Sequence, residues 1–462
     1  MTLTADQIVD SVLALAPEAG GYWVAFSGGL DSQVLLHALA ARRERLPAPL
    51  AALHVNHNLQ ADAPAWAEHC RAVCAALDVS YRLLSVAARP DAGESPEAAA
   101  RVARYRALAG ALPPGAALLT AHHRDDQAET LLLQLIRGAG PKGLAAMPAV
   151  AELDNALGAV PARNPERPVR LLRPLLEYSR DDLHAYAREQ GLQWIDDPSN
   201  ARTDYDRNYL RHEILPRLRA RWPAVNATLG RAAAHQAEAA ALLEDLAALD
   251  VQTVAGAWPG SLSVSALLRL SAPRRANLLR HWLHRSGVPV PAGAVLARIA
   301  PDVLRAAPDA EPLLAWPGAR LRRYRDLLLL DDLHEEEDPS RCLEWDMSQA
   351  LTLPGGVLRA EPAHGAGVAR RHFADGRCQV RFRQGGERLR PAGRREHHTL
   401  KHLFQEAGVP PWERMRVPLI HRGDSLIAVA GYWVCEGFQA ADDEPGVRFV
   451  WSRAIVPAGS FW

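Results

Sequence analysis

The stretch Tyr22-Trp23-Val24-Ala25-Phe26-Ser27-Gly28-Gly29-Leu30-Asp31-Ser32 decides the fold of the N-terminal part of the chain. Its apolar start predicts a short buried strand, and the helical periodicity from Ser32 to Arg42 predicts that a helix follows. Glycines between a strand and a helix let backbone N–H groups turn toward an anion, and the helix dipole adds attraction. A plain strand-to-helix turn is the alternative, but this context favours a phosphate-binding loop.

The side chains of this loop point to the same chemistry. Ser27 and Ser32 offer hydroxyl donors, and Asp31 offers a carboxylate for a magnesium ion held by phosphates. The Walker pattern with its lysine is absent, so this is a phosphate loop of another kind. The candidate phosphate-binding residues are Ser27, Gly28, Gly29, Leu30, Asp31 and Ser32.

Beyond the loop, strand-like and helical stretches alternate. Strands are expected at Ala51–Val55, Ser80–Val86, Ala116–Ala121 and Val169–Leu176. Helices are expected at Ala63–Leu77, Glu94–Leu108, Asp125–Arg137 and Ser179–Gln190. The alternation predicts an α/β fold with a doubly wound parallel sheet, whose strand C-termini form one ligand-binding edge.

The rest of the chain predicts two further domains. Ala224–Leu249 and Leu262–Ala307 have helical character, so an all-α middle domain is expected. Strand signals return at Cys378–Phe382, Leu426–Ala430 and Arg448–Trp451, with a helix at Thr399–Glu406 between them, which predicts a small α+β C-terminal domain. The expected domains are residues 1–215, 216–335 and 345–462.

Composition excludes several classes of protein. The chain has 462 residues, 48% of them hydrophobic and 23% charged, which excludes a mostly disordered chain. No apolar run could span a membrane, and no basic and apolar leader opens the sequence. Five dispersed cysteines argue against a disulfide framework, so a cytoplasmic protein is expected.

Charge is balanced overall but unevenly distributed. The 53 basic and 53 acidic residues cancel, which argues against a histone-like nucleic-acid binder. Between Arg370 and Arg416, however, twelve basic residues face five acidic ones. This segment is either a solubilising surface or a surface that contacts RNA phosphates.

Two polar stretches follow later strands. His54-Val55-Asn56-His57-Asn58-Leu59 follows the second expected strand, and Thr120–Thr130 contains His122, His123, Asp125, Asp126 and Glu129. Asp126 and Glu129 are three residues apart, so both carboxylates lie on one face of the expected helix. Helix capping is the alternative for these acids, and for Asp125 capping and function are equally favoured. For the two histidines, hydrogen bonding to a nucleotide and packing at a strand end are equally favoured.

The loop Ser27–Ser32 resembles the pyrophosphatase loop of the N-type ATP pyrophosphatases, whose fold is adenine nucleotide alpha hydrolase-like. These enzymes split ATP between the α and β phosphates and adenylate an acceptor. Further stretches are similar to the tRNA(Ile)-lysidine synthase family. They are Thr120–Thr130, Leu172–Leu176, Trp194–Asn200, Tyr205–Arg211, Leu400–Gln405 and Val409–Trp412. The resemblance covers nearly the whole chain.

The resemblance implies a specific reaction with three substrates, namely ATP, L-lysine and a CAU-anticodon tRNA(Ile), in the presence of Mg²⁺. ATP adenylates the C2 oxygen of the wobble cytidine 34, which releases pyrophosphate. The lysine ε-amine then attacks C2 and expels AMP, so the tRNA reads AUA instead of AUG. A tRNA thiolation enzyme and a non-catalytic tRNA-binding protein are the alternatives. The lack of a Cys-x-x-Cys pair speaks against the first, and the intact loop and carboxylates speak against the second.

Candidate roles follow from this chemistry. Asp31, Asp126 and Glu129 are the candidate proton acceptors, Asp126 and Glu129 also hold the substrate lysine, and Arg101 and Arg104 stabilise developing charge. ATP binding adds His54, Asn56, His57 and His122 to the loop, and Asp31 meets the magnesium ion. The tRNA-binding candidates are Arg207, Arg211, Arg381, Arg383, Arg388, Arg390, Arg394 and Arg395. A solvated helix or sheet face is the alternative for each arginine. The resemblance implies that the C-terminal domains grip the acceptor stem while the first domain holds the anticodon loop.

Overall fold

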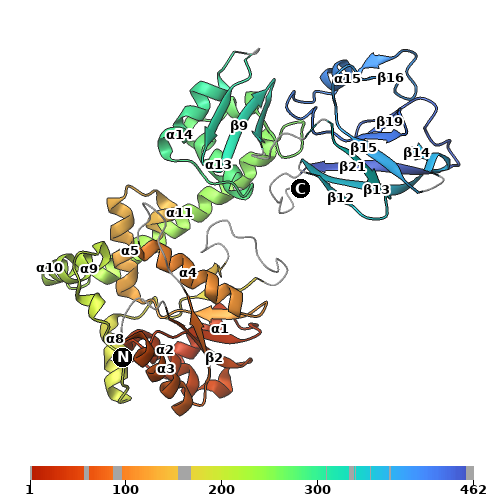
Figure 1. Cartoon of the computed structure of the whole chain (residues 1–462). Helices are drawn as coiled ribbons and strands as arrows, with labels where there is room; N and C mark the ends of the chain where they lie inside the picture. Colours follow the sequence, from red (N-terminus) through yellow and green to blue (C-terminus); the bar gives the residue numbers. More distant parts are fainter. Residues whose placement is uncertain are drawn as a thin grey trace. The chain divides into compact units, whose positions relative to one another are not determined.

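The structure is a computed structural model that forms two compact units, Met1–Asp245 and Leu246–Trp462 (Figure 1). It describes residues 3–56, 62–86, 96–153, 168–307, 310–331, 338, 340–353, 355–373 and 376–453. The three-domain division expected from the sequence stays a prediction.

A six-stranded sheet organises the first unit, in the order β3-β2-β1-β4-β6-β5. Its strands are β1 (Tyr22–Ala25), β2 (Leu50–Asn56), β3 (Ser80–Ser85), β4 (Ala117–Leu119), β5 (Val150–Glu152) and β6 (Arg170–Leu172). All neighbours pair in parallel except β5, which runs antiparallel along β6. The doubly wound sheet is confirmed, and the antiparallel edge strand is an addition that was not predicted.

Helices cover both faces of this sheet. They are α1 (Ala5–Leu15), α2 (Leu30–Ala41), α3 (Ala63–Ala76), α4 (Pro96–Ala111), α5 (Arg124–Ile136), α6 (Pro141–Leu144) and α8 (Arg180–Glu189). Successive residues of β1 serve two separate cores, with Tyr22 and Val24 in one and Trp23 and Ala25 against the other. This alternation follows from the two-residue period of a strand. The chain reverses direction across the sheet between β1 and β4, so ligands are expected at their carboxyl ends.

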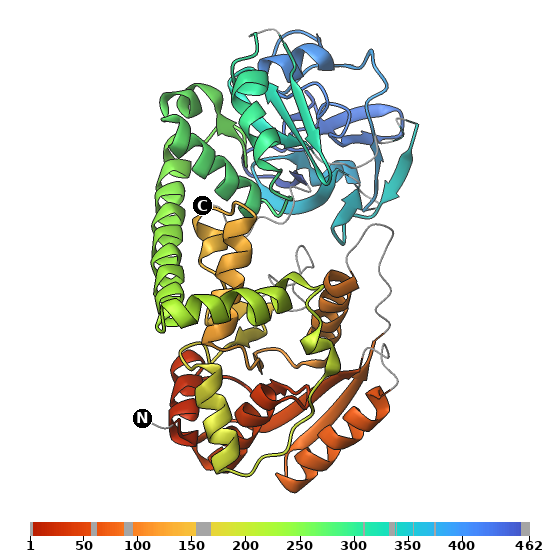
Figure 2. The same ribbon diagram turned by 90° about the vertical axis from the view of Figure 1, so that its left-hand side faces the viewer.

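A long helical run closes the first unit. It comprises α9 (Asp206–Tyr209), a π-helical turn (Leu210–Ile214), α10 (Leu215–Arg221) and then α11 (Val225–Val254), preceded by a 3₁₀ turn at Pro198–Ala201. In Figure 2 the yellow-green segment leads directly into the green α11. Wide π-helical turns are rare and frequent at functional sites.

The second unit begins with helices and a small antiparallel sheet. The helices are α12 (Val264–Arg269), α13 (Ala272–Arg285), α14 (Gly293–Arg298) and a π-helical turn (Ile299–Leu304). The strands are β7 (Leu262–Ser263), β8 (Leu313–Trp316), β9 (Ala319–Tyr324) and β10 (Leu327–Asp331), in the order β7-β10-β9-β8.

The expectation of an all-α middle domain was therefore wrong in this respect. Two-residue turns at Pro317–Gly318 and Arg325–Asp326 fold residues 313–331 into consecutive hairpins. Gly318 has a φ of +87° and Arg325 a φ of +54°, which are the positive values that tight hairpin turns require. The Pro-Gly pair directly after the apolar run Leu313–Trp316 was the sequence signal for this sheet.

The C-terminal part is α+β, as expected, and mostly β. One sheet contains β11 (Cys342–Trp345), β15 (Cys378–Arg381), β18 (Leu419–Arg422), β19 (Ser425–Val429) and β20 (Trp433–Val434). A second contains β12 (Leu351–Leu353), β13 (Gly356–His364), β14 (Val368–Ala369) and β21 (Pro445–Arg453). A two-stranded ribbon of β16 (Arg388–Leu389) and β17 (His398–Thr399) leads into α15 (Leu400–Glu406). In the part of the chain that the structure describes, no helix has the length and apolarity needed to cross a membrane.

Candidate active site

The loop after β1 has a backbone that only glycine permits. Gly28 has a φ of +84°, and a Cβ there would lie 2.9 Å from Cys70 Sγ and 3.0 Å from Ile195 Cδ1. The Ile195 N–H donates to the Gly28 carbonyl at 2.9 Å, which fixes the loop against residues 195–200. Ser27 Oγ accepts from the Gly29 N–H at 3.3 Å. The predicted loop is therefore a rigid turn, with glycine required by both conformation and space.

Asp31 stands in the first turn of α2 beside this loop. Its Oδ1 atom is buried and has no hydrogen-bond partner, while its Oδ2 lies 3.6 Å from His123 Nε2. Ser32 uses its hydroxyl inside the loop, donating to the Gly29 carbonyl at 3.0 Å. A carboxylate oxygen without a donor suits a cation that also binds phosphate, and the positive end of the helix attracts the phosphate itself.

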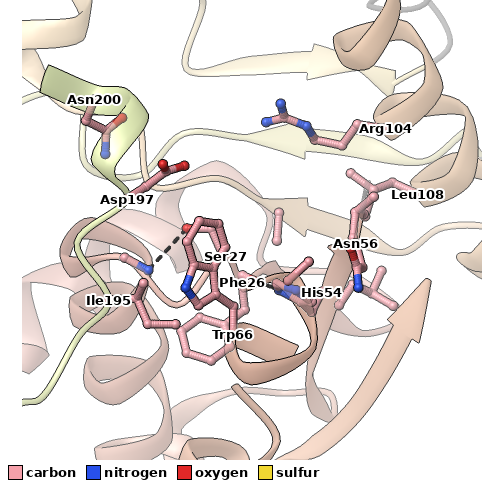
Figure 3. Close-up of a pocket in the computed structure, with 15 residues that line it drawn as sticks. Phe26, Ser27, His54, Asn56, Trp66, Arg104, Leu108, Ile195, Asp197 and Asn200 are labelled. Carbon is pink, nitrogen blue, oxygen red and sulfur yellow. Dashed lines mark hydrogen bonds between the residues drawn. The ribbon is translucent and has the colours of Figure 1, made fainter. Parts of the chain in front are cut away.

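A cavity of about 470 Å³ opens next to the loop (Figure 3). The ends of β1 and β2 form its floor, and α3, α4 and residues 195–200 form its walls. The lining residues include Phe26, Ser27, Gly29, His54, Asn56, Trp66, Arg104, Leu108, Ile195, Asp197 and Asn200. An apolar hollow with a few polar groups beside a phosphate loop has the character of a nucleotide site.

His54 supplies a fixed polar group to this cavity. Its Nδ1 lies 2.9 Å from the Phe26 carbonyl, which can only accept, so Nδ1 carries the proton. Burial lowers the pKa of His54 and keeps the ring neutral. The other ring nitrogen, Nε2, is then an acceptor for an N–H or O–H group of a bound ligand.

The remaining predicted residues of this region have different outcomes. Asn56 and Arg104 line the cavity. His57 and the side chain of Arg101 lie outside the described residues. His122 Nδ1 pairs with Thr120 Oγ1 at 2.9 Å and is not among the lining residues.

Trp66 was missed by the sequence analysis. The signal for it was its place in the first turns of α3, which follows the carboxyl end of β2.

A second group of charged residues, the cluster on α5, consists of Asp126 and Glu129 on α5 and of two arginines that reach them from the later helical run. Arg207 donates from Nε to Glu129 Oε2 at 2.7 Å, and Arg211 donates from Nε to Glu129 Oε1 at 2.6 Å. Both guanidinium groups also reach Asp126 Oδ1, at 3.2 and 3.1 Å. Glu129 is 1% exposed, so these are buried, hydrogen-bonded ion pairs.

This cluster changes the expectation for four residues. Asp126 and Glu129, the candidates for binding lysine, already hold guanidinium groups. Arg207 and Arg211, candidates for binding tRNA phosphates, are committed to these carboxylates. The spacing of Asp126 and Glu129 predicted that they share one face of α5. It could not predict their arginine partners, because those lie about eighty residues later in the chain.

His123 links this cluster to the phosphate loop. Its ring lies within 4 Å of three carboxylates, namely Asp31, Asp125 and Asp126. Burial disfavours the imidazolium, but the three negative charges outweigh burial and raise the pKa of His123. Burial also acts against the charged form of Asp126, yet His123, Arg207 and His122 lower its pKa to about 2.

Asp125 has a structural role. Its Oδ2 accepts from the Arg180 N–H at 3.0 Å, and its Oδ1 accepts from Asn226 Nδ2 at 2.7 Å and from Arg219. These bonds tie α5 to the starts of α8 and α11 and to α10. Capping and function were the two roles left open for Asp125, and the geometry adds a third, the connection between helices.

The paired cysteines of α3 are buried thiols. Burial raises the pKa of Cys70 to about 12 and that of Cys74 to about 11, so both stay protonated at neutral pH. A protonated thiol is a poor nucleophile and a poor metal ligand. Among the described residues no group of three or more acidic, histidine or cysteine side chains is arranged to hold a metal by itself.

The basic C-terminal segment divides into two kinds of arginine. Arg381 donates to Gln379 Oε1 at 2.7 Å and to the Gly423 carbonyl at 3.1 Å, and Arg383 lies 3.5 Å from Glu387. Both arginines are therefore engaged inside the domain. Arg388, Arg394 and Arg395 are exposed and Arg390 is half-buried, on or next to the ribbon β16–β17.

His421 on β18 gives a pH-dependent expectation for this domain. Burial and the nearby Arg381 lower its pKa to about 4, against the opposing influence of Asp424 and Glu387. Because the unfolded chain takes up the proton near pH 6.5 and the folded chain does not, stability falls as pH drops from about 6.5 toward 4. Denaturant unfolding of His421→Gln should show a shallower loss over that range. Equal slopes for both proteins would contradict this expectation.

Three family models match the chain. A "PP-loop domain" matches residues 4–218, a "TilS substrate binding domain" matches 262–329, and a "TilS substrate C-terminal domain" matches 378–451.

Curated relatives match along almost the whole chain. A protein of Alkalilimnicola ehrlichii named tRNA(Ile)-lysidine synthase is 47% identical over 95% of this chain and 95% of its own length. A protein of the same name from Coxiella burnetii is 43% identical over 94% of this chain and 93% of its own. A third, from Methylococcus capsulatus, is 43% identical over 96% of this chain and 99% of its own.

Proposed function

The chain belongs to the tRNA(Ile)-lysidine synthase family, and from this premise we propose that it converts the wobble cytidine of a CAU-anticodon tRNA(Ile) to lysidine. The reaction consumes ATP and free L-lysine and releases pyrophosphate and AMP. The observation that carries the proposal is the rigid loop Ser27–Ser32, with the unpartnered Oδ1 of Asp31, at the mouth of the cavity.

ATP occupies the cavity with its phosphates on the loop. The backbone N–H groups around Gly28 and Gly29 and the N-terminus of α2 attract the phosphates. Trp66 supplies an aromatic surface for the adenine ring, and His54 Nε2 accepts a hydrogen bond from the nucleoside. Arg104, at the cavity wall, balances charge that develops on the reacting phosphate.

Asp31 fits a magnesium ion that ATP brings with it. Mg²⁺ typically takes one or two protein carboxylates and fills its other positions with phosphate oxygens and water, so a single free carboxylate suffices. The ion supplies neutralisation of the charge that builds on the pyrophosphate leaving group.

The charges of the cluster on α5 determine which carboxylates can bind the substrate lysine or accept its proton. His123, Arg207 and His122 lower the pKa of Asp126 to about 2 against the effect of burial, so this carboxylate stays charged and accepts a proton poorly at neutral pH. Glu129 is enclosed by Arg207 and Arg211, so lysine reaches it only if those ion pairs open. Among the three candidate proton acceptors, Asp31 is the one with an oxygen free of donors.

Transfer of radiolabelled lysine tests this function directly. The full-length protein is incubated with ATP, magnesium, labelled lysine and a CAU-anticodon tRNA(Ile) transcript, with elongator tRNA(Met), which shares the anticodon, as the control. We expect label on the isoleucine tRNA alone. Pyrophosphate release without label transfer would contradict lysine as the acceptor substrate and would direct attention to sulfur donors.

The thiolation alternative has little support. Sulfur-transferring relatives use reactive cysteine pairs, whereas Cys70 and Cys74 are buried and protonated. No incorporation of sulfur is expected in an assay that supplies a sulfide source in place of lysine.

We propose further that the exposed arginines Arg388 and Arg395 contact tRNA phosphates. The double variant Arg388→Gln/Arg395→Gln should weaken tRNA binding, and the salt dependence of the binding constant should become shallower by about 0.7–0.9 for each lost contact. Fluorescence anisotropy at several salt concentrations measures both quantities. Arg381→Gln, which removes an internally bonded arginine, is the comparison and should leave the salt slope unchanged. An unaltered slope in the double variant would exclude these contacts.

A further inference from the structure

The helical run that carries Arg207 and Arg211 has two different faces. Each residue of a helix advances about 100°, so residues two apart point about 200° from one another. Arg207 and Arg211 share one face, four residues apart, and both reach the carboxylates on α5. Tyr209, the last residue of α9, precedes Arg211 by two residues, so it points away from that face. Tyr205 is the extended residue that precedes the first turn of α9.

The tyrosine face is open to solvent. Tyr209 is 47% exposed and Tyr205 is 38% exposed, whereas Tyr22, Phe26, Tyr105 and Tyr186 of the first unit are buried. The guanidinium carbon of Arg202 lies 5.1 Å from the centre of the Tyr205 ring. Two rings one helical turn apart, one of them stacked by an arginine, form an exposed aromatic platform.

Hydrogen bonds fix this platform beside the proposed nucleotide cavity. His212 Nε2 lies 2.8 Å from the Asn200 carbonyl, and Asn200 is a lining residue of the cavity. Asn208 donates from Nδ2 to the Arg202 carbonyl at 2.8 Å. The platform is thus held to the same segment that forms one wall of the cavity.

The net charge of residues 202–221 indicates which kind of partner contacts the two tyrosine rings. Residues 202–221 contain six arginines and three acidic residues, so the surroundings attract an anionic partner. Proteins recognise single-stranded RNA by stacking unpaired bases on aromatic rings and on arginine planes, next to groups that attract phosphates. Tyr205 and Tyr209, with Arg202 beside them, have the arrangement that such RNA-binding proteins use.

We propose that Tyr205 and Tyr209 stack the unpaired anticodon-loop bases that flank the target cytidine. This inference rests on the proposed function and names positioning residues for it. An unpaired base held outside the cavity compensates for the stacking that the target base loses when it leaves the loop and enters. Neither tyrosine is among the residues that line the cavity.

A fluorescent base tests the stacking without depending on activity. 2-Aminopurine replaces an adenine of the anticodon loop in the tRNA(Ile) transcript, and its fluorescence is recorded on binding to the full-length protein. We expect quenching by the wild-type protein and by Tyr209→Phe, which keeps the ring, and clearly less quenching by Tyr209→Ala. The value of kcat/KM for tRNA should fall about tenfold in Tyr209→Ala and recover in Tyr209→Phe.

Two measurements separate this proposal from a folding defect and from failure of the proposed function. The affinity of each variant for ATP alone should equal that of the wild type, because neither tyrosine lines the cavity. Trp222→Ala is the matched control: Trp222 is an exposed aromatic residue about 20 Å further along the helical run, and kcat/KM should be unchanged. Undiminished quenching in the Tyr205→Ala/Tyr209→Ala double variant would overturn the stacking proposal, whereas absence of lysine transfer by the wild type would overturn the proposed function instead.

Discussion

Replacement of Asp31 by asparagine should lower tRNA-dependent pyrophosphate release at least about a hundredfold. Asparagine keeps the size of the side chain and removes the charge. The Oδ1 of Asp31 is buried without a donor, so it is available to a cation on the phosphates, and an uncharged amide cannot provide the same interaction. The loop backbone is unaffected, because its conformation depends on Gly28 and not on this side chain.

The measurement is steady-state pyrophosphate release, with tRNA affinity determined in parallel. Affinity for tRNA should stay near the wild-type value because its phosphate contacts are proposed to lie elsewhere in the chain. Asp181→Asn is the matched control, since Asp181 also stands in the first turn of a helix, α8, but is not part of the loop Ser27–Ser32. Wild-type turnover in Asp31→Asn would remove Asp31 from the site.

Replacement of Glu129 by glutamine should destabilise the first unit by about 3–5 kcal/mol. Glu129 accepts three hydrogen bonds from Arg207 and Arg211, at 2.7, 2.6 and 2.9 Å, and is itself buried. The amide has no charge, so two largely buried guanidinium groups would share the single carboxylate of Asp126. The effect exceeds that of a surface ion pair because the remaining charges cannot be hydrated fully.

Urea denaturation followed by circular dichroism measures this change. Glu213→Gln is the control, because Glu213 pairs with Arg217 on the exposed side of the same helical run at 3.5 Å. An exposed pair contributes under about 1 kcal/mol, so this variant should unfold almost as the wild type does. Equal and small effects of both substitutions would show that the cluster on α5 is not a stabilising centre.

The N-terminal fold followed from local patterns. The apolar run of β1, the glycine turn and the helical period of α2 occupy adjacent residues, and hydrophobic burial acts on each of them in the same way wherever the element finally packs. The hairpins β8–β10 were not predicted, because their strands are only four to six residues long. Short hairpins carry weaker signals than repeated βα units do.

The candidate site also combines features that the sequence predicts with features that it does not. The loop Ser27–Ser32 and the shared face of Asp126 and Glu129 were readable, because both depend on residues within one turn of each other. The sequence did not predict that Arg207 and Arg211 bind those carboxylates. It also did not predict that Trp66 lies in the cavity wall.

The sequence by itself determined the phosphate loop, the parallel sheet and the family, since each rests on neighbouring residues and on the period of their burial. Only the tertiary structure decided which charges meet. It pairs Arg207 with Glu129, holds His123 among three carboxylates and leaves one oxygen of Asp31 without a donor. The physical reason is that a Coulomb interaction depends on distance in space and on burial, and the fold brings together groups that lie about eighty or more residues apart in the chain.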